Sequence, residues 1–188
     1  MILKSINKSF GDKRVLKDLS IEFKKGSRTC LMGASGSGKT TLLNIVMGLI
    51  KADGGEIIDA YGQISAVFQE DRLCEPFSAV ANVLSVTGNE TAREDIVALL
   101  GELGLQGSEE LPVNTLSGGM RRRVAIARAL LVKSELIILD EPFKGLDEET
   151  RRVVIDVINR YTVGKTLIVS THDIRDAADL GATVFNIE

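Results

Sequence analysis

Apolar and polar positions follow two periods along the chain, one typical of β-strands and one typical of α-helices. Up to about residue 30, alternating apolar side chains flank a polar turn at 11–14, which predicts an antiparallel hairpin. Short apolar runs predict buried strands at 28–32, 64–68, 135–139, 166–170 and 182–187. Apolar spacings of three and four residues predict helices at 40–49, 79–86, 93–103, 117–131, 148–160 and 173–180. Strands that alternate with helices favour an α/β domain with a mainly parallel core sheet.

The length predicts one domain that carries a short helical insert. At ~100–200 residues per domain, the 188 residues make a single domain over 1–188. From about residue 75 to residue 133 the pattern is helical and is broken by several glycines and by Pro112. We therefore expect a helical subdomain inserted in the core rather than a domain of its own.

Composition and charge exclude several classes of protein. With 44% apolar and 26% charged residues, the chain is typical of a soluble globular protein and not of a disordered, collagenous or disulfide-rich one. The formal charge of −3 provides no basic field for nucleic acid. No apolar run approaches the ~20 residues that span a bilayer, and the first ten residues lack the apolar core of a signal peptide. Two cysteines, Cys30 and Cys74, lack metal-ligand spacing, which favours a reducing cytosol.

A glycine-rich loop follows the predicted strand at 28–32 and precedes the predicted helix at 40–49. Its residues match G-x-x-x-x-G-K-[ST] in full: Gly33, Ala34, Ser35, Gly36, Ser37, Gly38, Lys39 and Thr40. Glycines let successive N–H groups converge, and the helix dipole adds positive charge, so the loop suits a polyphosphate such as that of ATP. Lys39 would bind the β- and γ-phosphates and the Thr40 hydroxyl would ligate Mg²⁺; Thr41 belongs to the same predicted site. The alternative is an ordinary Gly/Ser-rich turn.

Two carboxylates follow the buried strand at 135–139. Asp140 and Glu141 would lie at the carboxyl edge of the sheet, where α/β proteins bind ligands. We expect Asp140 to belong to the Mg²⁺ shell and Glu141 to polarise or orient the attacking water. A strand that ends in two solvated acids is the alternative.

A second glycine pair opens the helix that precedes these carboxylates. The segment Leu116-Ser117-Gly118-Gly119-Met120 closely resembles the LSGGQ signature of ATP-binding-cassette (ABC) ATPases. Other matches in the family's order are the arginine-rich helix start after it, Gln69 after a strand, Gly145-Leu146-Asp147, and Ser170-Thr171-His172-Asp173. The resemblance covers essentially the whole chain. It implies a P-loop NTPase fold of the ABC class, with a mainly parallel core sheet, an N-terminal antiparallel β-subdomain and a short helical insert.

The signature also has a physical interpretation of its own. Ser117 is a good N-cap, and Gly118 and Gly119 leave bare N–H groups at a helix start, which makes a second anion site. The resemblance implies that the signature of one subunit closes over the γ-phosphate bound to the other subunit. A capped helix without a ligand is the alternative.

The resemblance assigns roles to four further residues. Gln69 would link the metal site to the helical insert, and its amide carbonyl can ligate Mg²⁺ or water. His172, the only histidine, would contact the γ-phosphate, whereas from composition alone a structural histidine is at least as expected. Asp147 would contact the second subunit. Phe10 would stack on adenine, although it could also belong to the core.

Some positions depart from the family's usual pattern. Met120 replaces the usual glutamine, as it does in importer ATPases of the nitrate, sulfonate and taurine type, and Lys144 stands where Gly or Thr is commoner. In isolation, the run Arg121–Arg123 indicates a solvated face. The sequence also lacks the final hairpin and C-terminal helices of most members, so we expect no regulatory domain.

The resemblance implies an ATP-hydrolysing subunit of a membrane transporter, most simply a bacterial importer. Its partners would be a second ABC ATPase, in a homodimer or pseudo-dimer, and integral-membrane permease subunits that work with a substrate-binding protein. The chain would then lie in the cytoplasm, on the cytoplasmic face of the membrane and attached through the permease. The alternative is a soluble ABC ATPase of an assembly or maintenance complex without a permease.

Overall fold

The computed structural model describes residues 1–187, so Glu188, the last residue of the predicted domain, lies outside it. The elements are β1 (Ile2–Phe10), β2 (Lys13–Glu22), β3 (Arg28–Met32), α1 (Lys39–Val46), β4 (Gly54–Ile58), β5 (Ile64–Val67), α2 (Ala79–Thr87), η1 (Gly88–Glu90), α3 (Arg93–Glu102), η2 (Val113–Thr115), α4 (Gly118–Leu131), β6 (Leu136–Asp140), α5 (Glu148–Tyr161), β7 (Thr166–Ser170), α6 (Ile174–Asp179) and β8 (Thr183–Asn186). Here η marks a short 3₁₀ turn. The predicted elements are all present, with ends shifted by a few residues.

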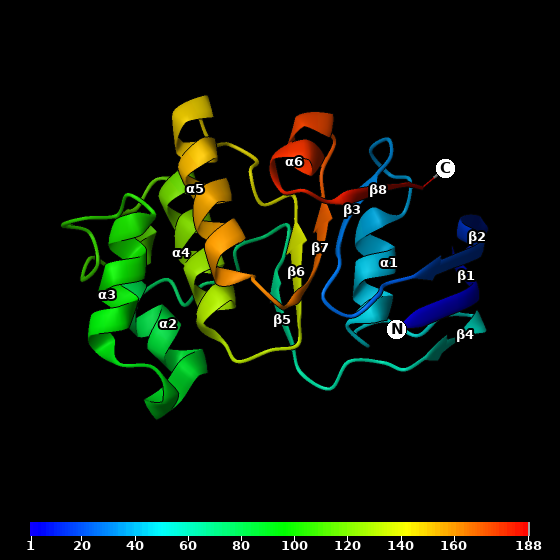
Figure 1. The fold of residues 1–188 in the computed structure, drawn as a ribbon, viewed down its shortest axis with the longest axis horizontal. Helices are drawn as coiled ribbons and strands as arrows, with labels where there is room; N and C mark the ends of the chain where they lie inside the picture. The colour runs from blue at the N-terminus through cyan, green and yellow to red at the C-terminus, as the bar shows by residue number, and fades with distance from the viewer. Residues whose placement is uncertain (188) are drawn as a thin grey trace.

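Two sheets form the frame of the molecule (Figure 1). The five-stranded sheet has the order β5-β6-β7-β3-β8, and every neighbouring pair in it is parallel. The three-stranded sheet has the order β2-β1-β4, and both of its pairs are antiparallel. The predicted α/β class with a parallel core sheet and an N-terminal antiparallel sheet is confirmed. The third strand of the smaller sheet, β4, was not predicted.

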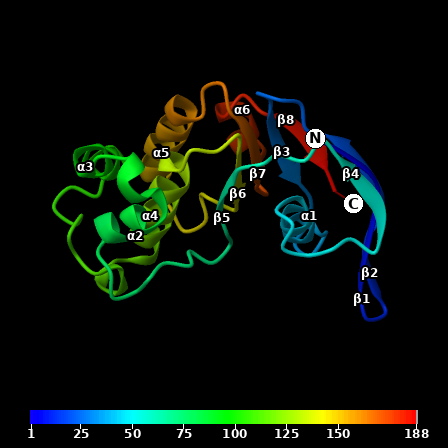
Figure 2. The same cartoon turned by 90° about the horizontal axis from the view of Figure 1, so that it is seen from below.

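Helices cover the parallel sheet on both faces. In Figures 1 and 2, α1 lies between the parallel sheet and the N-terminal sheet, whereas α4 and α5 lie on the other side with α2 and α3 outside them. Strand β6 is buried along its whole length for this reason. Leu136 and Ile138 belong to the apolar cluster around α1, and Ile137 and Leu139 belong to the cluster of the other helices. Successive side chains of the strand therefore enter two different cores.

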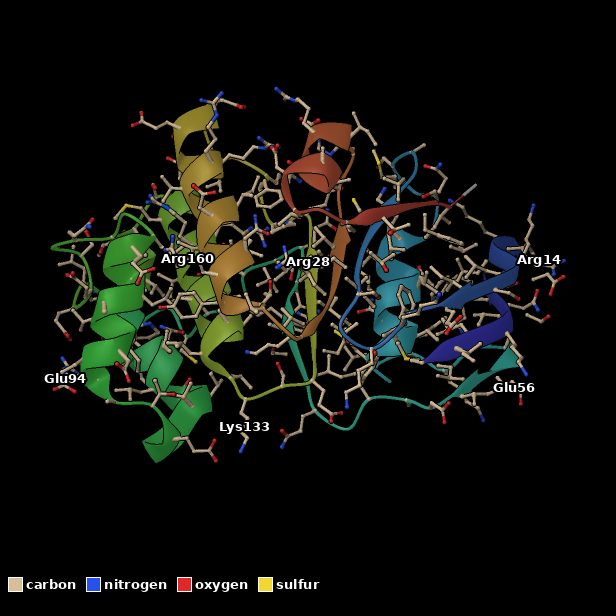
Figure 3. The ribbon with its side chains drawn as sticks, in the orientation of Figure 1. Arg14, Arg28, Glu56, Glu94, Lys133 and Arg160 are labelled. Atoms are coloured by element: carbon tan, nitrogen blue, oxygen red, sulfur yellow. The ribbon has the colours of Figure 1, made fainter. Side chains whose placement is uncertain are left out.

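Arg28 links strand β3 of the parallel sheet to helices α5 and α6. Its guanidinium lies near the middle of the molecule in Figure 3, whereas Arg14 and Glu94 lie toward opposite ends. It donates to the carbonyl of Leu180 at 2.9 Å and to the hydroxyl of Thr162 at 3.1 Å. One planar group with several donors thus joins β3 to the ends of α5 and α6.

The parallel arrangement decides where the functional loops lie. Strands β3, β5, β6 and β7 run in the same direction, so their carboxyl ends meet at one edge of the sheet. The glycine-rich loop follows β3, Gln69 follows β5, Glu141 follows β6, and His172 follows β7. None of the helices in residues 1–187 is long and apolar enough to cross a membrane.

Candidate functional site

One open pocket lies at this edge of the sheet. It has a volume of about 540 Å³ and is lined by Phe10, Lys13, Val15, Ser35, Gly36, Gly38, Lys39, Thr40, Thr41, Gln69, Asp140, Glu141, Lys144 and His172. The lining combines positions from the glycine-rich loop, the carboxylate pair, and the segments after β5 and β7. These segments are far apart in the sequence, and most of the lining residues were predicted to belong to one site.

The glycine-rich loop needs its glycines for conformation and for close packing. Gly36 and Gly38 have φ angles of 81° and 103°, which side chains other than glycine rarely adopt. A Cβ atom on Gly38 would lie 2.8 Å from the Leu16 side chain, and one on Gly33 would lie 2.6 Å from the Ser37 hydroxyl. The loop is therefore fixed against β2 and against itself. Gly33, Ala34 and Ser37 form its body without lining the pocket among the described residues.

Lys39 begins α1 and points back over the loop. Lys39 is 8% exposed. Its ammonium donates to the carbonyl of Gly33 at 2.7 Å and to that of Ala34 at 3.1 Å. An ammonium group has three donors, so a further one is available for an anion. The buried hydroxyl of Ser37 has no hydrogen-bond partner within residues 1–187. A polyphosphate in the loop would find the positive charge of Lys39 there.

A chain of oxygens lies beside the lysine. The Thr40 hydroxyl donates to Oδ2 of Asp140 at 2.8 Å, and the Ser170 hydroxyl donates to Oδ1 of the same carboxylate. Gln69 lines the same pocket. A hydroxyl, one carboxylate and an amide carbonyl are the hard oxygen ligands that Mg²⁺ prefers, and Mg²⁺ commonly takes its other ligands from water and substrate phosphates. The donor set fits this ion, although no three His, Cys, Asp or Glu side chains of the described residues form a metal cluster.

Glu141 is held in a strained backbone conformation at the end of β6. Its φ angle is 50°, and its N–H donates to the Ser170 carbonyl at 3.1 Å and to the Ser170 hydroxyl at 3.0 Å. Oε2 of its carboxylate lies 3.1 Å from Nδ1 of His172. A left-handed conformation in a non-glycine residue is costly and persists where the surroundings impose it, often at functional sites. The carboxylate and the imidazole thus meet at the edge of the pocket.

The far wall of the pocket comes from the N-terminal sheet. Phe10 is 50% exposed and lines the pocket, so it does not belong to the core. Lys13 and Val15 of β2 line the same wall and were not predicted. Their signal in the sequence is the alternation along β2, which places residues two apart on one face. An exposed aromatic ring beside an aliphatic side chain suits the flat face of a nucleobase.

The prediction of a solvated face at Arg121–Arg123 is wrong for two of its residues. Arg122 is buried; it donates to the carbonyls of Phe68 and Gln69 at 2.6 Å each, and its Nε lies 3.2 Å from a carboxylate oxygen of Asp71. Arg123 donates to the carbonyl of Leu103 at 2.7 Å. These guanidinium groups donate to carbonyls of segments that are distant in sequence. The residues around the arginines therefore could not predict these hydrogen bonds.

The signature residues lie outside the pocket of their own chain. Ser117, Gly118 and Gly119 are absent from the described pocket lining. Ser117 caps α4, because its hydroxyl accepts from the N–H of Met120 at 3.3 Å. A Cβ on Gly119 would lie 3.3 Å from the Leu146 side chain, whereas space around Gly118 is open. The helix start therefore has open space beside Gly118, outside the pocket of its own chain.

Asp147 also lies outside the pocket lining, at the start of α5. Its carboxylate accepts from the N–H of Thr150 at 2.8 Å and from the Thr150 hydroxyl at 2.9 Å. These hydrogen bonds hold the pKa of Asp147 below its usual value. Leu146, the residue before Asp147, packs close to Gly119 of the signature. Asp147 therefore follows a residue that contacts the signature.

Known proteins resemble this chain in sequence and in fold. The ABC transporter family matches residues 16–144. The aliphatic sulfonates import ATP-binding protein SsuB 2 of Burkholderia cenocepacia is 38% identical over 97% of this chain and 71% of its own length. SsuB 3 of Rhodococcus jostii is 38% identical over 99% of this chain and 70% of its own length.

Solved structures of ABC transporter cassettes are similar to this chain in fold. The dimeric bacterial ABC transporter cassette MJ0796 superimposes with a TM-score of 0.87 and 30% identity, over 99% of this chain and 93% of that one. A post-hydrolysis state of the same cassette, bound to ADP and Pi, gives the same score over 100% of this chain. The family match covers more than half of the residues, and the geometry of the pocket agrees with it. The chain therefore belongs to the ABC transporter family and is an ATPase.

Proposed function

We propose that this chain is the ATP-binding, ATP-hydrolysing subunit of a bacterial importer, with the pocket described above as its nucleotide site. The observation that carries the proposal is the meeting of Lys39, the Thr40–Asp140 pair and the Glu141–His172 pair in one pocket. The names of the relatives, import ATP-binding proteins, support the importer. They also make an aliphatic sulfonate the first substrate to test.

The triphosphate would lie on the glycine-rich loop with its charge countered by Lys39 and by backbone N–H groups. The adenine would stack on Phe10 at the wall formed by β1 and β2. A bound Mg²⁺ supplies charge neutralisation on the phosphate oxygens, and Thr40, Asp140 and Gln69 are the residues that would hold it. Ser35, Gly36, Gly38 and Thr41 would complete the cradle.

Hydrolysis needs a water held in line with the γ-phosphate. The Glu141 carboxylate is 18% exposed and faces the pocket, so it can accept a proton from, or orient, this water. His172 is positioned to stabilise charge that develops on the γ-phosphate, because its imidazole lies beside the same carboxylate. The backbone of Glu141, held by Ser170, fixes the direction of its side chain.

A second ATPase subunit would complete each site. Ser117, Gly118 and Gly119 would bind the γ-phosphate held by the partner, and Asp147 would contact the partner near the same place. The dimeric state of the solved cassettes supports this arrangement. Loss of the γ-phosphate removes charge from the interface, so the two subunits would separate after each hydrolysis.

The transport role requires a membrane partner. We propose that a permease holds the chain at the cytoplasmic face of the membrane, with a substrate-binding protein on the other side. Co-purification from membranes tests this step: an integral-membrane partner supports it, whereas a soluble multi-protein complex without a permease contradicts it.

The variant Glu141→Gln tests the proposed chemistry. The amide keeps the size of the side chain but is a poor proton acceptor, so hydrolysis should fall by about 100-fold or more while ATP still binds. Phosphate release and nucleotide binding are measured on the same preparation. Hydrolysis at the wild-type rate would contradict the role of Glu141 and the site itself.

A further inference from the structure

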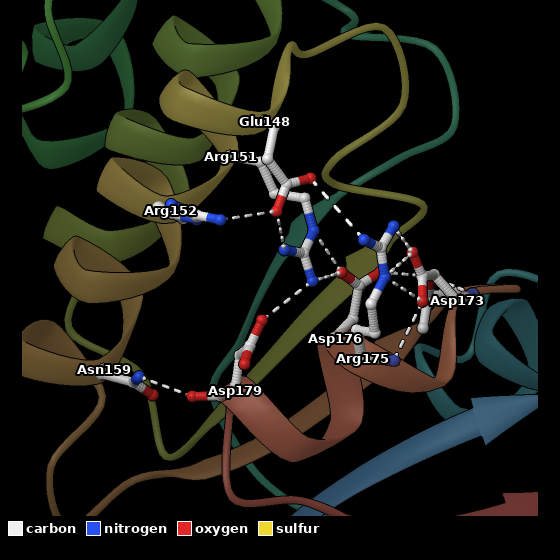
Figure 4. Close-up of polar contacts among 9 residues, drawn as sticks. Glu148, Arg151, Arg152, Asn159, Asp173, Arg175, Asp176 and Asp179 are labelled. Carbon is white, nitrogen blue, oxygen red and sulfur yellow. Dashed lines mark hydrogen bonds and ion pairs between the residues drawn. The ribbon is translucent and has the colours of Figure 1, made fainter.

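A buried ion pair joins α5 to α6 next to the candidate site. Arg151 and Asp176 are 7% and 2% exposed. The Nε atom of Arg151 donates to Oδ1 of Asp176 at 2.7 Å, and Nη2 lies 3.0 Å from a carboxylate oxygen of Asp179. Figure 4 shows Arg151 of α5 between these two acids of α6 and Glu148 of its own helix.

The second oxygen of Asp176 leads directly to the segment that carries His172. It accepts a hydrogen bond from the Thr171 hydroxyl, and that hydroxyl accepts in turn from the N–H of Asp173 at 3.1 Å. The residues on both sides of His172 are therefore bonded into one network. The imidazole between them lies 3.1 Å from Glu141.

Arg151 is also connected to the loop that follows Glu141. Its guanidinium lies 5.9 Å from the centre of the Phe143 ring, a cation–π contact at the limit of the usual range. Phe143 comes two residues after Glu141. Arg151 is thus linked to the Glu141 side through Phe143 and to the His172 side through Asp176 and Thr171. Burial of two charges costs free energy that an apolar pair of similar size would not cost. Stability alone therefore does not account for the choice of Arg and Asp here.

We propose that the Arg151–Asp176 pair is a positioning device that sets His172 against Glu141. Neither residue lines the pocket among the described residues, so both act through Thr171 and the backbone beside the histidine. The inference rests on the proposed function, because it assigns its effect to the rate of ATP hydrolysis. It predicts that the pair controls kcat and leaves ATP binding to the glycine-rich loop.

The first test compares two arginines on the same helix. In Arg151→Met the ion pair is lost, and kcat should fall about tenfold or more while KM for ATP changes less than about twofold. The matched control is Arg152→Met. Arg152 is 73% exposed at its side chain and lies 3.5 Å from Glu148, so this variant should keep the wild-type kcat. Equal kcat values for the two variants would overturn the proposal.

The second test separates positioning from stability. Arg151→Met leaves Asp176 buried without its partner and could fail to fold, so the double variant Arg151→Met with Asp176→Leu carries the test in that case. An apolar pair should bring the melting temperature to within about 3 °C of the wild type. The Thr171 hydroxyl still lacks its acceptor, so kcat should stay low.

The outcomes of the two tests are distinct. A double variant that regains both stability and kcat shows a merely structural pair and overturns the inference. Wild-type hydrolysis in Glu141→Gln would instead contradict the proposed function. Low kcat with normal melting and normal KM in the double variant, together with the inactive Glu141→Gln, supports both.

Discussion

Lys39 illustrates how the chain holds one charge ready for a ligand. The residue is largely buried, and its ammonium is oriented by two carbonyls of its own loop. Carbonyl groups satisfy donors without neutralising the charge, which keeps the lysine attractive to a polyphosphate. The sequence motif could predict this residue because both the lysine and the loop that orients it lie within eight consecutive residues.

Replacement of this lysine should therefore affect binding more than folding. In Lys39→Ala, we expect ATP affinity to fall about 10- to 100-fold, since a hydrogen bond to a charged group is worth about 1.5–3 kcal/mol. Calorimetric titration with ATP measures the loss, and thermal unfolding of the apo protein serves as the control. Unchanged affinity together with unchanged hydrolysis would contradict the phosphate-loop assignment.

Cys30 gives a second prediction at the scale of one residue. Burial, followed by the negative charges of Asp176 and Glu141, raises the pKa of its thiol from 9.0 to about 11. The unfolded thiol ionises near pH 9.0, so the stability that Cys30 contributes is complete below pH 9 and is lost progressively as the pH rises toward 11. Denaturant unfolding at several pH values should show this loss in the wild type and a flatter dependence in Cys30→Ala.

Cys74 is the natural control, because it is an exposed cysteine in the same chain. Cys74→Ala should keep the steep dependence of stability on pH. A thiol reagent at pH 8 should modify Cys74 at once and Cys30 only after unfolding. Rapid modification of both thiols in the native protein would contradict the burial of Cys30.

The burial of a strand and the distance in sequence to its partner decide whether the sequence could predict it. The apolar runs of β3, β6 and β7 are buried on both faces and stand out locally. Strand β4 was missed because it opens with two glycines and pairs with β1, about 50 residues away. Gly55 is required there: its φ angle is 91°, and a Cβ would lie 2.5 Å from the carbonyls of Lys4 and Ser5. Only the fold shows this close approach.

Helix α4 acts on the site through the segment that two of its arginines hold. Arg122 binds the carbonyls of Phe68 and Gln69, while Arg128 binds those of Asp71 and Arg72. Two arginines on one helix thus hold the segment 68–72, which carries Gln69, through four of its carbonyls. A run of charged residues is normally solvated, so the run Arg121–Arg123 predicted an exposed face. The acceptors of Arg122 are over 50 residues away in sequence, so the run itself could not indicate them.

Loss of Arg122 should therefore loosen the loop and weaken the fold. In Arg122→Ala, the buried cation and its pair with Asp71 are removed, and the free energy of unfolding should fall by about 3 kcal/mol. The rate of Mg²⁺-dependent hydrolysis should fall as well, because Gln69 is no longer held. Urea unfolding and phosphate release measure the two effects.

Arg121 provides the matched control for this prediction. It precedes Arg122 on the same helix and is more exposed. In Arg121→Ala, stability should stay within about 0.5 kcal/mol of the wild type. Similar losses in the two variants would show that the contacts of Arg122 are not what holds the loop.

At the scale of the whole molecule, the proposed function needs two chains to complete one site. The pocket collects the residues of four strand ends, but the signature at the start of α4 lies outside its described lining. The helix start carries two glycines, which cost helix stability, and the space around Gly118 is open. If the signature of one chain lies over the pocket of the other in a two-fold dimer, symmetry repeats the contact and completes both sites.

A mixing experiment tests this exchange between subunits. Lys39→Ala damages the loop and leaves the signature intact, whereas Ser117→Arg damages the signature and leaves the loop intact. Each variant alone forms dimers with two damaged sites and should be inactive. In a mixed dimer, one site combines both defects, and the other combines an intact loop with an intact signature.

The activity expected of the mixture follows from the fraction of sites that are intact. Equal amounts of the two variants give mixed dimers as about half of the population, each with one of its two sites intact, so about a quarter of the wild-type activity should return. If the signature served the pocket of its own chain, every subunit in the mixture would carry a defect and no activity could return. Phosphate release from the mixture, compared with each variant alone, therefore decides whether the signature acts on its own subunit or on the partner.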